Sequence, residues 1–182
     1  MISLIIKSFY LILPAYLANM APPLFGRLGW LEFLNRPVDG GKKLGDNLLF
    51  GKNKTWRGLA AAVIFGVLTT LIQLGLSHWQ FFRGISLIDY SSNWLVFGLL
   101  AGSGAILGDL AKSFFKRRLG RKPGTAWPVF DQLDFVVGFF IFTWWLVAPT
   151  WLVVLVIVVM TLILQPLVNI LAYIFKFKKV WW

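Results

Sequence analysis

The chain has 182 residues, of which 58% are hydrophobic and only 14% are charged, and its formal net charge is +11. Because a soluble domain carries roughly 25% charged residues, this composition excludes an ordinary soluble enzyme and indicates an integral membrane protein. The chain has no cysteine, which excludes disulfides and thiol chemistry. The basic residues flank apolar segments, so we expect anionic lipid and phosphate compounds as partners, and no nucleic acid.

Apolar segments near the length needed to span a bilayer recur along the whole chain. They predict an all-α integral membrane protein, a single domain over residues 1–182 built as a bundle of about five transmembrane helices. The expected spans are residues 2–25, 58–76, 94–110, 131–147 and 151–175. Pro22 and Pro23 are expected to end the first span. Two polar loops carry most of the charge. The loop at about 26–57 connects spans one and two, and the loop at about 111–130 connects spans three and four.

The distribution of charge predicts the orientation of this bundle. In a five-span arrangement, sixteen of the eighteen Lys and Arg residues fall on one side, in the two polar loops and the carboxy-terminal tail. The positive-inside rule places that side in the cytoplasm. We therefore expect a multi-pass protein of the cell membrane with its amino terminus outside and its carboxy terminus in the cytoplasm.

The third span carries a stripe of small residues, Gly98, Gly102, Gly104 and Gly108. Small residues at this spacing let two helices approach closely. We expect this approach within the five-helix bundle; the alternative is the interface of a homodimer.

Three acidic residues lie at helix ends around the second polar loop. Asp109 ends the third span, and Asp131 and Asp134 begin the fourth at a spacing that puts both carboxylates on one helix face, about 5–6 Å apart at Cβ. Carboxylates in such places are costly unless they are paired or bind metal, and their oxygens suit Mg²⁺. The alternative is that each pairs with a nearby cation, such as Lys112 with Asp109.

The first polar loop contains two runs of glycine and lysine, Asp39-Gly-Gly-Lys-Lys43 and Gly51-Lys-Asn-Lys-Thr-Trp-Arg-Gly58. Glycines let backbone N–H groups approach an anion, and the lysines add positive charge. The second run opens a helix, whose free N–H groups also favour phosphate. Neither a Walker A nor a Rossmann glycine motif occurs. The alternative is a basic loop that only fixes membrane topology.

Several of these stretches together resemble the archaeal CDP-archaeol synthase family. The similar stretches cover spans one to four and both polar loops: Leu13-Pro-Ala-Tyr-Leu-Ala-Asn-Met-Ala-Pro22, Asp39-Gly-Gly-Lys-Lys43, Lys54-Thr-Trp-Arg-Gly58, Gly108-Asp-Leu-Ala-Lys-Ser-Phe-Phe-Lys-Arg-Arg118 and Pro128-Val-Phe-Asp-Gln-Leu-Asp134. One departure is Lys52, which stands where an acidic or small polar residue is expected.

The resemblance implies a membrane cytidylyltransferase that uses CTP and a lipid phosphate, 2,3-bis-O-geranylgeranylglycerol 1-phosphate or a related one, to form a CDP-lipid and pyrophosphate. It also implies Mg²⁺, or Mn²⁺ in its place, on Asp109, Asp131 and Asp134. Together with Lys112, these three acids are the expected catalytic residues. The residues expected to bind nucleotide or phosphate are Asp39, Lys42, Lys54, Thr55, Arg57, Ser113, Lys116, Arg117 and Lys122.

Two other functions remain open from the sequence. A CTP-dependent polyprenol or lipid kinase would also use CTP but would release CDP in place of pyrophosphate. A non-catalytic membrane protein could bind anionic lipid through its basic loops. The apolar helix surfaces carry no recognisable code for the chemistry of the lipid chains.

Overall fold

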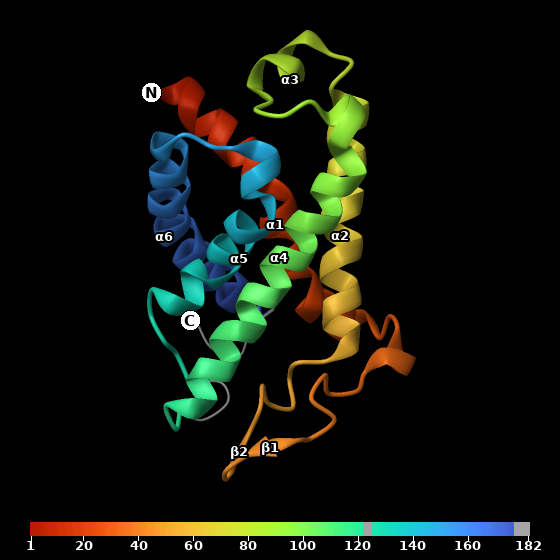
Figure 1. Ribbon diagram of the computed structural model, residues 1–182, viewed down its shortest axis with the longest axis vertical. Coiled ribbons are helices and arrows are strands. Elements are labelled where there is room, and N and C mark those ends of the chain that lie inside the picture. The colour runs from red at the N-terminus through yellow and green to blue at the C-terminus, as the bar shows by residue number, and fades with distance from the viewer. Residues whose placement is uncertain (122–124, 177–182) are drawn as a thin grey trace.

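The computed structural model describes residues 1–121 and 125–176, and five of the helices there are long and apolar enough to cross a membrane (Figure 1). They are α1 (Ile2–Leu28), α2 (Trp56–Leu76), α4 (Tyr90–Arg118), α5 (Phe130–Val147) and α6 (Trp151–Ile174). The expected all-α bundle of five membrane helices is confirmed. The connections contain the 3-10 turn η1 (Glu32–Leu34), strands β1 (Lys43–Leu44) and β2 (Asn47–Leu48), and the short helix α3 (Gln80–Ile85).

The first helix does not end at its proline pair, which corrects the sequence prediction. Pro22 and Pro23 lie inside α1, and the helix continues to Leu28, where it is capped by Gly29 in a left-handed conformation with φ of 67°. Proline costs a helical hydrogen bond but fits helical φ. Here the ring of Pro22 packs close to Gly58 at the start of α2, so the helix continues against a neighbour without a side chain.

Helix α4, which corresponds to the third expected span, is longer at both ends than the expected residues 94–110. It begins at Tyr90 and continues through Arg118. Residues 111–118 are therefore helical, which corrects the sequence prediction that they belong to a loop. Apolar character falls at Asp109, but no helix breaker follows until Gly120, whose φ is 68°. Basic residues in the last turn also favour the carboxy-terminal end of a helix. The other three spans agree with expectation to within two residues at each end.

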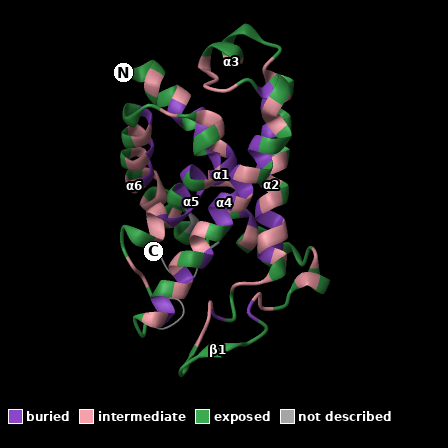
Figure 2. Cartoon of the chain, in the orientation of Figure 1, coloured by how far each residue is buried: buried purple, intermediate pink, exposed green. Residues whose placement is uncertain are grey.

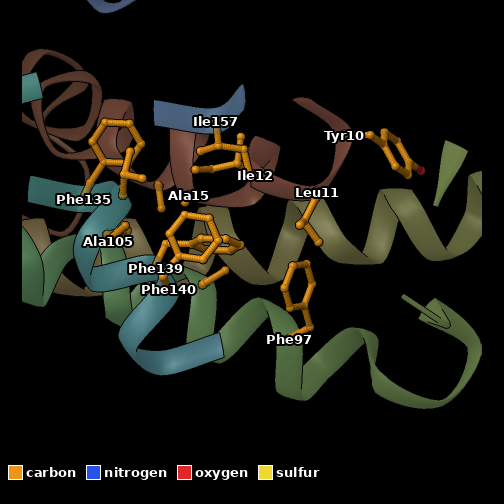
Figure 3. Packing of buried hydrophobic residues seen from close by; sticks show 14 of the residues in the cluster. Tyr10, Leu11, Ile12, Ala15, Phe97, Ala105, Phe135, Phe139, Phe140 and Ile157 are labelled. Atoms are coloured by element: carbon orange, nitrogen blue, oxygen red, sulfur yellow. The ribbon is translucent and has the colours of Figure 1, made fainter. Parts of the chain in front are cut away.

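The hydrophobic core lies where α1, α4, α5 and α6 meet, as Figure 3 shows. Ile12 of α1, Phe97 of α4, Phe139 of α5 and Ile157 of α6 are all fully buried. The rings of Phe97 and Phe139 pack edge to face with their centroids 6.0 Å apart, a favourable geometry for aromatic pairs. This core holds α4 and α5 together, and both helices lead to the candidate site.

Glycines bring α4 into backbone contact with α2 on one side and α5 on the other. A Cβ atom on Gly102 would lie 2.8 Å from the carbonyl oxygen of Ala62 in α2, and one on Gly104 would lie 2.6 Å from the carbonyl oxygen of Gly138 in α5. The small-residue stripe is thus used within the chain. A homodimer through the same stripe would have to displace one of these helices, and a homodimer remains a prediction.

The connecting segments divide between the two ends of the bundle (Figure 1). The amino terminus and α3 lie at one end, called here the α3 end. The opposite end, called the loop end, carries the β1–β2 hairpin, the end of α4 and the start of α5. The strands pair antiparallel, with Lys43 opposite Leu48, and exposed residues gather on this hairpin (Figure 2).

Candidate active site

The candidate site lies at the loop end, where α4 extends beyond the core and α5 begins. Asp109, Lys112 and Lys116 follow at spacings of three and four residues on α4, which places them on one face of the helix. Asp131 and Asp134 lie in the first turns of α5, which packs against α4. Asp109 and both α5 acids therefore face each other across one helix contact.

A glycine sets how closely these two helix segments approach. A Cβ atom on Gly108 would lie only 2.2 Å from the carbonyl oxygen of Asp134, so a larger residue would push the helices apart. Gly108 precedes Asp109 directly in the chain. The glycine contact therefore determines the separation of the carboxylates of Asp109 and Asp134.

The ammonium group of Lys112 joins all three acids. Its Nζ atom lies 3.1 Å from Oδ1 of Asp109, 3.1 Å from Oδ1 of Asp131 and 2.6 Å from Oδ2 of Asp134. An ammonium group has three N–H donors, so each can point to a different carboxylate. The sequence alternative, in which Asp109 pairs with Lys112, is therefore realised as part of a larger network.

Two further lysines complete the network. Lys54, from the segment just before α2, pairs with Asp109. Lys116 lies 3.0 Å from both carboxylate oxygens of Asp131. Three aspartates thus share three lysines, which makes the group neutral in net charge. We call these six residues the lysine–aspartate network.

Neutrality matters because the network is poorly accessible to water. The side chain of Asp134 is 3% exposed, that of Asp109 is 13% exposed and that of Lys112 is 15% exposed. Charged groups at membrane-embedded positions are costly unless they are paired, and removing one partner of such a pair leaves an uncompensated charge. The six residues are therefore mutually dependent.

The first turn of α5 is built to direct Asp131 toward the network. Its Oδ2 atom accepts a hydrogen bond from the backbone N–H of Trp127 at 2.5 Å. Between them, Val129 adopts φ of 68°, which is unusual for a β-branched residue. The ring of Trp127 stacks on that of Phe130 with centroids 4.3 Å apart. This tight turn brings the chain into α5 with Asp131 facing α4.

A cavity of about 230 Å³ adjoins the network. It is lined by the α4 residues Lys112, Ser113, Lys116 and Arg117 and by the loop residues Phe50, Gly51, Lys52, Asn53 and Lys54. Arg117 is only 7% exposed, and its Nε atom has no hydrogen-bond partner among the described residues. A buried, unsatisfied guanidinium nitrogen is costly, and a bound anion would satisfy it.

Larger hollows occur elsewhere but lack this concentration of charge. One of about 470 Å³ at the α3 end is bordered by Arg83, Asp89 and several neutral residues. Another of about 820 Å³ at the loop end is bordered by Arg36, Trp56 and apolar or glycine residues. Five cationic side chains converge only on the smaller cavity, among the hollows found in the described part of the chain.

Four of the expected phosphate-binding residues lie at this cavity: Lys54, Ser113, Lys116 and Arg117. Asp39 instead organises the first loop, because its carboxylate accepts hydrogen bonds from the N–H groups of Gly41, Phe50 and Gly51. Burial raises the pKa of Asp39, but these N–H groups lower it by more, so its pKa is held below its ordinary value.

Three other expected residues lie away from the cavity lining. Thr55 is the N-cap of α2 and accepts a hydrogen bond from the N–H of Gly58. Arg57 pairs with Glu32 of η1, whose side chain is 62% exposed. Lys42 is exposed in the loop before β1. Lys122 lies outside the described residues. Nucleotide contact by these residues remains a prediction.

Three contributors were not among the residues expected to bind nucleotide or phosphate. Lys52 and Asn53 line the cavity although only their neighbours were expected to bind phosphate; their position between Gly51 and Lys54 was the available signal. Arg118 donates hydrogen bonds to the carbonyl oxygens of Leu44, Asn47 and Leu48. It thereby attaches the hairpin to the end of α4, a contact with no sequence signal.

The expected metal ligands are close together but occupied by lysine. Within residues 1–121 and 125–176, no group of three His, Cys, Asp or Glu side chains is spaced to hold a metal ion. The chemistry of the donors nevertheless fits a hard divalent cation, because three carboxylates each direct an oxygen to one point, the Nζ atom of Lys112. A metal could use these oxygens only if Lys112 moved.

Comparison with known proteins identifies the family. The family model described as CDP-archaeol synthase matches residues 1–182. The CDP-archaeol synthase of Methanosarcina barkeri is 40% identical over 183 residues, covering 93% of this chain and 99% of that protein. The CDP-archaeol synthase of Methanococcus aeolicus is 33% identical over 182 residues, covering 100% of this chain and 98% of that protein.

A solved structure, described as an intramembrane enzyme for archaeal membrane lipids biosynthesis, has a similar fold. It superposes with a TM-score of 0.74 at 32% sequence identity, covering 89% of this chain and 92% of that chain. The family model spans all three segments that form the lysine–aspartate network: the residues before α2, the end of α4 and the start of α5. By sequence and by fold, the chain belongs to the CDP-archaeol synthase family.

Proposed function

We propose that the lysine–aspartate network and its adjoining cavity are the site of CTP-dependent cytidylyl transfer to an archaeal lipid phosphate, forming a CDP-lipid and pyrophosphate. Family membership makes the chain a lipid-phosphate cytidylyltransferase. The observation that carries the location is the convergence of Lys52, Lys54, Lys112, Lys116 and Arg117 on one cavity at the end of two membrane helices. Such a cavity suits a triphosphate whose partner substrate stays in the bilayer.

The reaction asks for positioning and charge neutralisation more than for a protein nucleophile. An oxygen of the lipid phosphate forms a bond to the α-phosphorus of CTP, and the bond from that phosphorus to the oxygen bridging to the β-phosphate breaks. Lys54, Lys116 and Arg117 would bind the triphosphate and stabilise the leaving pyrophosphate. The unpartnered Nε atom of the buried Arg117 is available for such a contact.

A divalent metal, which we propose is Mg²⁺ or Mn²⁺, would be held by Asp109, Asp131 and Asp134. Their carboxylate oxygens match the ligand preference of these hard cations. When bound, the metal would neutralise charge on the phosphates. The chain's own contribution is to hold the three acids in place through the Gly108 contact and the Trp127 hydrogen bond.

We propose further that the loop end faces the cytoplasm of the cell, where CTP is made, with the amino terminus outside. The described parts of the two polar segments, which hold most of the Lys and Arg residues of the sequence, lie at this end (Figure 1), and the positive-inside rule places such a side in the cytoplasm. Because the chain has no cysteine, single cysteines at Ser91 and Thr125 can be labelled in intact cells with a membrane-impermeant thiol reagent. Labelling of Ser91→Cys alone is expected; labelling of both from the same side would refute this orientation.

The reaction is tested with purified protein, a divalent metal, a panel of ether- and ester-linked lipid phosphates together with a polyprenol, and CTP labelled either at the α- or at the γ-phosphate. Cytidylyl transfer moves only the α-label into lipid and releases pyrophosphate. A CTP-dependent lipid kinase would move the γ-label and release CDP. A protein that only binds anionic lipid would move neither label.

The Asp131→Asn/Asp134→Asn double variant is the matched test of the site. Asparagine keeps the shape of aspartate but removes the charge that attracts a hard cation, so we expect turnover to be abolished. Asp89→Asn is the control: Asp89 caps α4 at the α3 end by accepting hydrogen bonds from Ser91 and Ser92, and asparagine is an equally good N-cap. Full metal-dependent turnover by the double variant would end the assignment.

A further inference from the structure

The position of Lys112 raises a question that the proposed chemistry does not answer. Its ammonium group occupies the point on which Asp109, Asp131 and Asp134 converge, and the same side chain lines the cavity that would receive the triphosphate. One lysine therefore stands between the expected metal position and the expected phosphate position. Once a metal binds the three carboxylates, the ammonium group of Lys112 can no longer remain among them and must lie in the cavity.

We propose that Lys112 is a place-holder for the divalent metal: it holds the three carboxylates together until the metal–nucleotide complex arrives, and then moves its charge to the phosphates. This inference rests on the proposed function and deepens it. Through Lys112, metal binding at the three acids is linked to nucleotide binding in the cavity.

Contact geometry distinguishes Lys112 from the other cations of the network. Lys54 pairs with Asp109 alone, and Lys116 pairs with Asp131 alone. Lys112 contacts one oxygen of each acid, at 2.6 to 3.1 Å, and so uses all three of its N–H donors. Among the described residues, only this cation occupies a position shared by three carboxylates, which is what a metal ligated by all three would need.

The charges explain why a place-holder is useful. Asp134 and Asp109 are almost inaccessible to water, and three unneutralised carboxylates at a helix contact would repel one another. An ammonium ion and a metal ion cannot occupy the same position, so they compete for the same oxygens. Without nucleotide, a metal would force Lys112 into a cavity already bordered by four other cations.

When nucleotide is present, the displaced ammonium group contacts negatively charged phosphates in the cavity, and its repulsion by the other cations there is offset. Metal and nucleotide should therefore each strengthen the binding of the other, since coupling between two sites is reciprocal. The competition also means that the acids should bind metal weakly when no nucleotide is present. Removing the ammonium removes this competition.

The test measures Mn²⁺ binding to the purified full chain without nucleotide, by electron paramagnetic resonance of free Mn²⁺. Methionine has a length similar to lysine but no charge, so Lys112→Met should bind Mn²⁺ at least about tenfold more tightly than the wild type, a change worth about 1.4 kcal/mol. The matched controls are Lys54→Met and Lys116→Met, which border the same cavity but contact one acid each. We expect each to change the Mn²⁺ dissociation constant by less than about threefold, as for a single nearby charge that is partly screened.

A second measurement covers the case in which Lys112→Met folds poorly because its acids are left unbalanced. The Lys112→Met/Asp109→Asn variant restores the charge balance and is compared with Asp109→Asn alone. The double variant should bind Mn²⁺ more tightly than the single one, and Mn²⁺ should raise its melting temperature by more. Equal or weaker Mn²⁺ binding after loss of Lys112, in either background, would overturn the place-holder role.

The outcomes separate this inference from the proposed function. If the wild type makes CDP-lipid but loss of Lys112 leaves Mn²⁺ binding unchanged, only the place-holder role fails. If the wild type transfers no cytidylyl group to any lipid phosphate tested, the proposed function fails, whatever the Mn²⁺ result.

Discussion

The contact between Gly138 and Gly104 offers a direct test of how the fold positions the acids. A Cβ atom on Gly138 would lie 2.0 Å from the carbonyl oxygen of Gly104 and 3.0 Å from Cα of Gly108. Because Cβ atoms do not approach other heavy atoms to less than 3.0 Å, Gly138→Ala must separate α4 and α5 by about 1 Å, since close-packed interiors cannot absorb the overlap. Asp109 follows Gly108 in the chain, and Asp134 lies one turn before Gly138, so the same shift reaches both carboxylates.

Two effects are expected from this separation. Overpacking of this kind destabilises proteins by about 1–3 kcal/mol, which lowers the melting temperature. A misplacement of about 1 Å between catalytic groups can cost about 10²-fold in rate, so kcat/KM per folded molecule should fall by that order. The assay is lipid-linked label from α-labelled CTP, with the folded fraction taken from size-exclusion chromatography in detergent.

Two glycines of α2 separate positioning from stability. Gly66→Ala places a Cβ atom 2.6 Å from the carbonyl oxygen of Gly98, nearer the α3 end, and should lower the melting temperature with little loss of kcat/KM. Gly75→Ala meets no atom within 4 Å and should change neither. Wild-type kcat/KM in folded Gly138→Ala, or an equal loss in Gly66→Ala, would refute the positioning argument.

Three further outcomes are expected. Lys116→Ala should weaken use of CTP roughly ten- to a hundredfold, since a charge-assisted hydrogen bond contributes about 1.5–3 kcal/mol, while Arg83→Ala at the α3 end should be silent; equal effects would misplace the phosphate site. Arg118→Ala removes the hydrogen bonds between α4 and the hairpin, so amide exchange of residues 43–48 should accelerate at least tenfold with α4 unaffected; unchanged exchange would contradict this anchoring role. Because the pKa of Asp39 is lowered in the folded chain, its stabilisation is present above the unfolded value of about 3.9 and lost as pH falls through the folded pKa. The excess melting temperature of the wild type over Asp39→Asn should therefore be present at pH 7, begin to fall only below the unfolded value of about 3.9, and disappear once the pH is below the lower folded pKa; a pH-independent difference would exclude this linkage.

The sequence by itself determined the number and kind of the long membrane helices. Each span is long and apolar because a membrane helix must satisfy its backbone internally and expose apolar side chains to lipid, so composition along the chain suffices to find it. Five stretches taken together, among them those around Asp109 and Asp131, also pointed to the family. Their spacing predicted that Asp131 and Asp134 share one face, because helical periodicity is a local property.

Helix ends were less accessible to sequence reasoning, for a physical reason. The apolar part of α4 ends near Asp109, but the backbone continues as helix to Arg118 because no helix-breaking residue lies there. Hydropathy reports where lipid ends, whereas hydrogen bonding and packing decide where a helix ends. The prolines of α1 show the same distinction, since contact with α2 accommodates them.

Only the tertiary structure decided how the charges are shared. Lys54 and Asp109 are 55 positions apart in the chain, and no period or motif relates two residues at such a distance. The sequence presented Lys112 as one cation among many, yet the packing of α4 against α5 makes its ammonium the point where three carboxylates meet. Side chains that are neighbours only in space acquire their roles from helix packing, which here depends on glycines that let two backbones touch.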